Sequence, residues 1–320
     1  MDAKDGLVMG ATISQLAERF PEKTFTHRVI HATTGEKIVA EVPLYLFRGE
    51  SGNWPETTSS MQRIRTHQHR AFETLPTKLY GAFAASIEAI TLRASAELES
   101  FLGMSQMQAA GFTQHYGLPT EFIDVTSSLR VATGFAVGNP KTWSDRRRVH
   151  IAVIDMRKAI NSCIVADLSS MIDFARRPRV QHAYGFFHRK HINLKSPDCI
   201  ADIGLCWHDI LIEPVEAESY VLLPDLLDAH RDRAAGVLQL ILDDLAKSDG
   251  KWPDEVAMFL ADNVTAAPFI TRVIRMEGTR PAEVELVPAE DVGLRYDEAE
   301  ERAANRRLWS RKFPDTQRKR

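Results

Sequence analysis

Two short runs of residues hold most of the side chains that could do chemistry in this chain. The first is Phe47-Arg48-Gly49, which ends the apolar run Leu44-Tyr45-Leu46. A strand fixes the backbone of an arginine at its end, and a following glycine lets the chain turn away without a Cβ clash. The guanidinium is a planar fork of donors suited to carboxylate or phosphate. Arg48 is therefore either the partner of a carboxylate or a phosphate-binding residue.

The second run begins at Gln114-His115 and ends in the three hydroxyl residues 126–128. His115 could act as a general acid or base, although a histidine beside glutamine is often a hydrogen-bonded structural residue. Asp124 and Thr126 are expected on one face of a short strand, because strand side chains repeat every two residues. The hydroxyls precede a predicted helix and are natural N-cap candidates. Capping explains one of them and leaves the rest of the group unexplained.

Composition sets limits on the class of protein. Hydrophobic residues make up 44% of the 320 residues, charged residues 26%, and the net charge is -3. This is an ordinary globular balance without a global attraction to nucleic acid. No apolar stretch approaches the roughly 18 residues of a membrane span, and no signal sequence follows Met1. We therefore expect a cytoplasmic protein with no membrane partner.

Neither the cysteines nor the histidines predict a metal or disulfide site. The three cysteines are too few and too irregularly spaced for a disulfide framework or a zinc site; they are Cys163, Cys199 and Cys206. The histidines cluster at His182, His188 and His191, but no acidic or thiol ligand lies at a suitable spacing from them. No metal is expected.

Hydrophobic periodicity predicts an α+β fold with a small, central, mixed or antiparallel sheet, a helical insert and a helical C-terminal segment. Helices are predicted at residues 12–20, within 71–110, and at 128–135, 238–245 and 255–261. Strands are predicted within 24–47 and at 122–125, 149–154, 186–187, 220–223 and 283–287. The insert carries an apolar stripe of helical period at Ile87, Ile90, Ala94, Leu98 and Phe101-Leu102.

These runs resemble the FRG domain, a family of mainly bacterial and phage proteins. The shared residues are Phe47-Arg48-Gly49, residues 114–120, Asp124, Thr126 and the helix at 132–136. The chain departs from the family pattern in having Glu50 for Gln, Glu121 for Arg and Val125 for Trp. The resemblance implies an FRG domain at residues 44–232, preceded by a lead-in at 1–43. The periodicity and charge of the sequence after it predict a mainly helical segment at 233–296 and a charged tail at 297–320.

The order of the motifs also resembles that of ADP-ribosyltransferases, which carry an arginine, a Ser-Thr-Ser strand and a glutamate. This resemblance implies NAD as the substrate and a protein or nucleic acid as the target. It implies an NAD pocket that contains Phe47, Arg48, Gly49, Gln114, Thr126 and Ser127. Gln181 stands third in the order, but a neutral amide cannot stabilise positive charge as a carboxylate does. The glutamate itself is left open among Glu213, Glu216 and Glu218.

Three alternatives stay open beside the transferase. The domain could bind a nucleotide or nucleic acid without catalysis. It could be a hydrolase or nuclease in which His115 acts with Arg48 and Asp124. It could also be chiefly an interaction module. The resemblance to FRG proteins also implies a biological setting: a toxin or phage-defence effector that is controlled by an antitoxin or regulatory partner.

Overall fold

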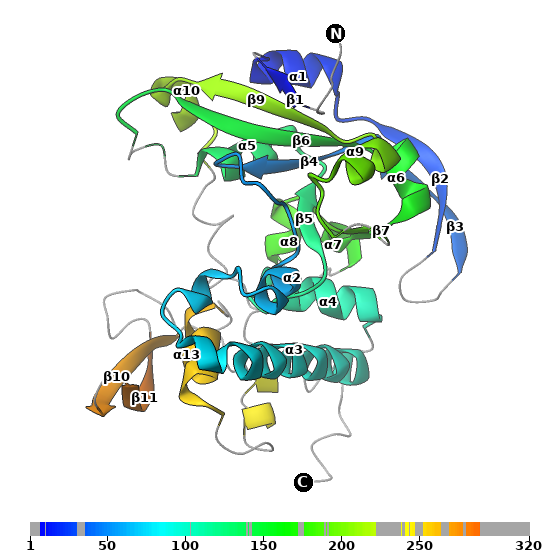
Figure 1. Cartoon of the computed structure of the whole chain (residues 1–320). Helices are drawn as coiled ribbons and strands as arrows, with labels where there is room; N and C mark the ends of the chain where they lie inside the picture. Colours follow the sequence, from blue (N-terminus) through cyan, green and yellow to red (C-terminus); the bar gives the residue numbers. More distant parts are fainter. Residues whose placement is uncertain are drawn as a thin grey trace. The chain divides into compact units, whose positions relative to one another are not determined.

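The computed structural model divides the chain into two compact units with interleaved sequences (Figure 1). The sheet unit comprises Met1–Ser59, Phe122–Ile172 and Pro178–Leu227, and the helix unit comprises Ser60–Glu121, Asp173–Arg177 and Asp228–Arg320. The structure describes residues 7–9, 11–30, 36–102, 104–138, 140, 143–171, 176–188, 190, 192–221, 238, 241–242, 244–246, 252–263, 269–277 and 280–288.

A seven-stranded open sheet forms the sheet unit, and only its edge pair, β1 and β9, is parallel. All the other neighbours are antiparallel. The fold is thus α+β with a mostly antiparallel sheet, as expected, although the sheet is larger than the sequence suggested. In spatial order the strands are β1 (Leu7–Met9), β9 (Cys206–Ile212), β6 (Arg147–Asp155), β4 (Tyr45–Glu50), β5 (Ile123–Thr126), β8 (Ala183–His188) and β7 (Cys163–Asp167).

Both faces of this sheet are covered. On one face, here called the α5 face, Phe47 packs among buried residues of α1 (Ile13–Arg19) and α5 (Leu129–Val137). On the other, here called the α9 face, Leu46 packs in a cluster that includes residues of α6 (Met156–Ser162) and α9 (Pro197–Ile203). Successive residues of β4 therefore face opposite cores, as the period of two in a strand requires.

The smaller elements of the sheet unit surround this core. Helix α1 begins at Thr12, whose side chain forms a capping box with Gln15. The remaining elements are the antiparallel pair β2 (Thr24–Ile30) and β3 (Lys37–Pro43), α7 (Leu168–Met171) and α10 (Pro214–Glu218). Helix α8 (Arg176–Val180) contains the point where the chain passes from the helix unit to the sheet unit. The strand expected at residues 220–223 is wrong at Tyr220 and Val221, because their backbone N–H groups bond back into α10.

The helix unit is built around α3 (Tyr80–Leu102). The predicted apolar stripe is confirmed at Ile87, Ile90, Ala94 and Leu98, which are all buried. The other described elements are α2 (Ser60–Arg65), η1 (Arg70–Phe72), η2 (Thr77–Leu79), α4 (Gln106–His115), α13 (Asp254–Asn263) and the antiparallel pair β10 (Phe269–Glu277) and β11 (Arg280–Pro288). The expected tail at 297–320 lies outside the described residues. No helix in the described part of the chain is long and apolar enough to cross a membrane.

Gly49 is required by a close approach of two backbones. The expectation that the chain turns away at this glycine is wrong, because β4 continues through Glu50. A Cβ at Gly49 would lie 1.8 Å from the Ala132 carbonyl oxygen and 2.9 Å from the Ala136 nitrogen, both on α5. The missing side chain therefore lets α5 pack directly against β4.

We expect Gly49→Ala to destabilise the protein by about 3 kcal/mol or more, because the atoms that clash belong to a helix backbone. Urea unfolding would measure this loss. Gly81→Ala is the matched control, since a Cβ there meets nothing within 4 Å. If the two variants unfold at the same urea concentration, α5 does not depend on Gly49.

His208 is a buried histidine on the α5 face, with its ring centroid 5.4 Å from that of Phe20. Neither of its ring nitrogens has a hydrogen-bond partner in the described structure. Burial, with a smaller effect of Arg19, lowers the pKa of His208 to about 4 from the ordinary 6.5. Folding therefore keeps this imidazole neutral.

The unfolded chain protonates His208 near pH 6.5 and the folded chain only near pH 4, so stability falls as the pH is lowered between these values. The wild type should lose up to about 3 kcal/mol of unfolding free energy over this pH range through His208, and His208→Phe should abolish this part of the loss. Unfolding of both proteins at pH 7.5 and at pH 4.5 would measure it. Equal losses in the two proteins would contradict a neutral buried imidazole.

Candidate anion-binding site

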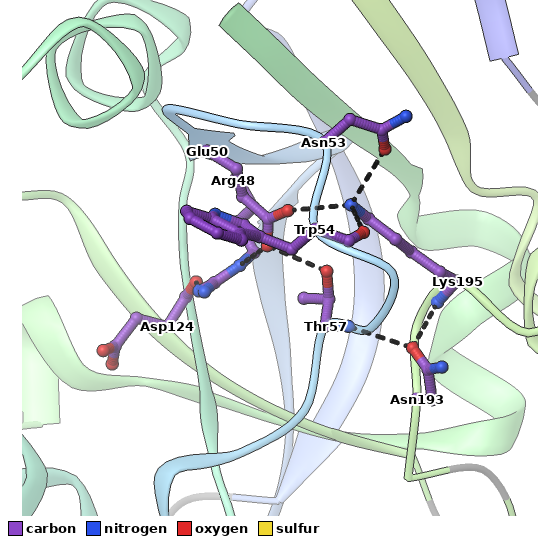
Figure 2. Close-up of polar contacts among 8 residues, drawn as sticks. All are labelled: Arg48, Glu50, Asn53, Trp54, Thr57, Asp124, Asn193 and Lys195. Carbon is purple, nitrogen blue, oxygen red and sulfur yellow. Dashed lines mark hydrogen bonds and ion pairs between the residues drawn. The ribbon is translucent and has the colours of Figure 1, made fainter. Parts of the chain in front are cut away.

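Glu50, a buried carboxylate at the end of β4, is the centre of the candidate site (Figure 2). Its Oε1 accepts hydrogen bonds from Arg48 Nε at 3.1 Å and from the Thr57 hydroxyl at 2.8 Å. Its Oε2 lies 3.1 Å from Lys195 Nζ, an ion pair without the geometry of a hydrogen bond. One carboxylate thus holds two cations from distant parts of the chain.

Arg48 is held by a second contact as well. Its Nη1 donates to the backbone carbonyl of Asp124 at 2.7 Å, across from β4 on β5. The side chain keeps 22% of its surface exposed, so solvent reaches the guanidinium. The pairing with a carboxylate considered from the sequence is therefore present, and its partner is Glu50.

Lys195 approaches Glu50 from the segment that precedes α9. Its ammonium donates to the Trp54 carbonyl at 2.5 Å and to Asn53 Oδ1 at 3.4 Å. It also lies 4.4 Å from the ring centroid of Trp207, a cation–π contact. The Lys195 side chain is only 12% exposed, so its charge depends on these partners and on Glu50.

The loop at residues 51–59 is fastened to the same segment by further bonds. Asn193 Oδ1 accepts from the backbone N–H groups of Thr57, at 3.0 Å, and of Lys195, at 2.9 Å. The Leu194 N–H donates to the Thr57 carbonyl at 2.9 Å. Figure 2 shows the two contacts of Asn193. The position of the loop is thus fixed relative to Glu50.

Ionisable residues continue from Glu50 across the α9 face of the sheet. Glu50 is the register partner of His150 on β6, which is the partner of Asp209 on β9. Arg148 Nη1 binds Asp209 Oδ2 at 2.8 Å. Burial lowers the pKa of His150, an effect that the nearby Asp209 opposes. With His150 neutral, this face carries three cations and two carboxylates, a balance that favours binding of an anion. The cations are Arg48, Arg148 and Lys195, and the carboxylates are Glu50 and Asp209.

The predicted residues of β5 lie on the other face. By the register of Phe47 with Thr126, the side chains of Thr126 and Asp124 share the α5 face with Phe47, away from Arg48. The Thr126 hydroxyl donates to the Gln181 carbonyl at 2.8 Å and accepts from the Ser128 N–H at 3.0 Å. The structure therefore joins Thr126 to Gln181 and places neither hydroxyl nor carboxylate of this strand beside the guanidinium.

The hydroxyls of residues 126–128 do not cap α5 in the expected way. Ser128 is the N-cap residue, but its side chain makes no capping bond. Glu22 Oε1 instead accepts from the Leu129 N–H at 2.7 Å. Ser127 bonds through its backbone N–H to the His182 carbonyl at 3.1 Å. A carboxylate from before β2 satisfies the helix end in place of the local hydroxyls.

Gln114 and His115 lie on α4 in the helix unit. Gln114 Oε1 accepts a hydrogen bond from the Thr120 hydroxyl. His115 is buried, and its carbonyl accepts from Arg177 Nη1 at 2.8 Å. Gly117 follows with a φ of 99°, which favours glycine. Residues 114–120 thus form the end of α4 and the turn that follows it in the helix unit.

Other residues considered from the sequence are found elsewhere. Glu121 pairs with Arg65 in the helix unit, and Arg65 also binds Glu88 at 2.5 Å. The three glutamates left open, Glu213, Glu216 and Glu218, are exposed at or on α10. No group of three or more His, Cys, Asp or Glu side chains in the described ranges could hold a metal ion.

We expect Glu50→Ala to cost about 3 kcal/mol of unfolding free energy, because it leaves Lys195 and Arg48 without their shared counter-charge. Glu50→Gln should cost less, since an amide still accepts from Thr57. The control is Glu56→Ala, an exposed carboxylate of the same loop. Chemical denaturation of all three variants would measure the costs. An alanine at 50 no more harmful than one at 56 would show that Glu50 does not hold the cations together.

Comparison with known proteins identifies the part of the chain that carries this site. The family model described as FRG domain matches residues 43–145. Searches of the curated proteins and of the solved structures give no match. The matched segment includes Arg48, Glu50 and the loop that covers them, whereas Lys195 lies beyond it. The chain therefore contains an FRG domain.

Proposed function

We propose that the sheet unit, which carries most of the FRG domain, binds the phosphates of a nucleotide at Arg48 and Lys195, and that this nucleotide is NAD. ADP-ribose would then be transferred to a protein or nucleic acid. The observation that carries the proposal is the buried Glu50 with a cation on each side, at 3.1 Å in both cases. In the resemblance to ADP-ribosyltransferases, an arginine and a carboxylate are the two charged groups required.

Arg48 is suited to phosphate because part of its guanidinium is already fixed. Nε and Nη1 are bonded to Glu50 and to the Asp124 carbonyl, while Nη2 has no bond to the described residues. A guanidinium held by two bonds loses little further freedom when a ligand binds its remaining donors. Lys195 adds a second cation, and the partial exposure of Arg48 gives a ligand access.

Glu50 is the carboxylate that the transferase interpretation lacked. In ADP-ribosyl transfer the bond between the ribose C1′ and the nicotinamide nitrogen breaks, and nicotinamide leaves as a neutral base. The target nucleophile forms the new bond to C1′ and loses its proton to a base or to water. A carboxylate stabilises the positive charge that develops on the ribose. Thr57, bonded to Glu50, is the hydroxyl on this side in place of Thr126.

Binding without turnover is the second candidate, and one observation favours it. Glu50 is already paired with Arg48 and Lys195 in the absence of ligand. Its negative charge is therefore less able to stabilise a positive charge on the ribose. The hydrolase interpretation gains no such support, because the Asp124 side chain lies on the α5 face. The setting of a toxin or phage-defence effector, with an antitoxin or regulatory partner, rests on the resemblance to FRG proteins.

We expect wild-type protein to bind NAD and Arg48→Gln to bind it at least about tenfold more weakly, because a charge-assisted contact to phosphate is lost. Calorimetric titration would measure both affinities. Arg147→Gln is the control: Arg147 is an exposed arginine of β6 that lies over the Trp143 ring. Thermal unfolding of each variant would show that the fold is retained.

Turnover is tested separately with labelled NAD and a cell lysate. The transferase predicts release of nicotinamide and label on a macromolecule, both lost in Arg48→Gln. Binding without either product would establish the binding module. If NAD neither binds nor reacts, the proposed function is wrong.

A further inference from the structure

Trp54 is an exposed tryptophan beside the Glu50 cluster. It lies in the loop at residues 51–59 and keeps 58% of its surface exposed. Trp207, on the α9 face below the same lysine, is only 5% exposed. Burial of an indole stabilises a fold, so a largely exposed one contributes little to this fold and is available to a ligand.

The backbone of Trp54 is fixed to the cluster. Its carbonyl accepts the 2.5 Å hydrogen bond from Lys195 Nζ, the same ammonium that lies 3.1 Å from Glu50 Oε2. The Asn53 side chain binds this ammonium too, at 3.4 Å. The backbone of Trp54 is therefore held at Lys195, and in the view of Figure 2 the indole extends from the loop on the side where Arg48 and Glu50 lie.

Gly52 supports the indole from within the loop. A Cβ at Gly52 would meet Cε2 and Cζ2 of Trp54 at 3.4 Å, so the indole lies beside Gly52 in the loop. The Trp54 N–H also donates to the Gly52 carbonyl at 3.0 Å. The bond fixes the backbone of Trp54, and the indole beside Gly52 stays largely exposed. An aromatic ring that is ordered before binding loses little entropy when a planar group stacks on it.

We propose that Trp54 stacks on the base of the nucleotide whose phosphates are bound by Arg48 and Lys195. This inference rests on the proposed function and names the class of its ligand: a nucleotide with both a base and a diphosphate. Stacking on an aromatic ring tolerates different bases, because every base has a π-face. The cations select phosphate, and Trp54 separates a nucleotide from inorganic phosphate.

The test compares two probes that share the diphosphate. ADP-ribose carries a base, whereas inorganic pyrophosphate does not. Trp54→Ala should weaken the binding of ADP-ribose about tenfold and leave that of pyrophosphate unchanged. Trp54→Phe, which keeps a ring, should retain most of the affinity. Val215→Ala is the control, since Val215 is an exposed apolar residue of α10.

Calorimetric titration of the full chain distinguishes the outcomes. If Trp54→Ala weakens both probes equally, or neither, the indole does not stack on a base and the inference is wrong, while the phosphate site stands. If the wild type binds pyrophosphate as tightly as ADP-ribose, the base makes no contact, with the same consequence. If the wild type binds neither probe, both the phosphate site and the stacking contact are overturned.

Discussion

The arrangement of the sheet unit around its candidate site depends on one buried charge. Glu50 accepts hydrogen bonds from Arg48 and Thr57 and forms an ion pair with Lys195. These contacts connect β4 to the loop that follows it and to the segment before α9. A carboxylate is costly to bury alone, and so is an ammonium, so each requires the other. A glutamine at this position could accept the same hydrogen bonds without neutralising either cation.

The alternation of side chains along β4 explains why Phe, Arg and Gly follow one another. Phe47 and Gly49 face α5, where the first fills the core and the second lets the helix approach. Arg48 and Glu50 face the opposite side, where the charges are. One strand thus supplies a packing surface and an ionic site, and a shift of register by one residue would exchange them.

Local elements could be predicted from the sequence and long-range contacts could not. The capped helix after Thr12, the strand that contains Arg48, and the pairing of this arginine with a carboxylate all follow from neighbouring residues. Lys195 and His150 join the site only through chain segments far from Glu50, which no local period reveals. That Asp124 and Thr126 share a face of the sheet was predictable from the sequence. That Arg48 lies on the opposite face depends on the pairing of β4 with β5.

The interleaving of the two units also constrains how the protein is made. β4 leaves the ribosome before either of its neighbours, because β5 and β6 follow the whole segment Ser60–Glu121. Both hydrogen-bonding edges of β4 are then unpaired. β1 stays unpaired for longer, because its partner β9 is synthesised later than β5 and β6. Such non-local pairing slows folding and exposes strand edges to wrong partners. The strand pairing of the sheet unit therefore cannot be completed until residue 212 has been synthesised.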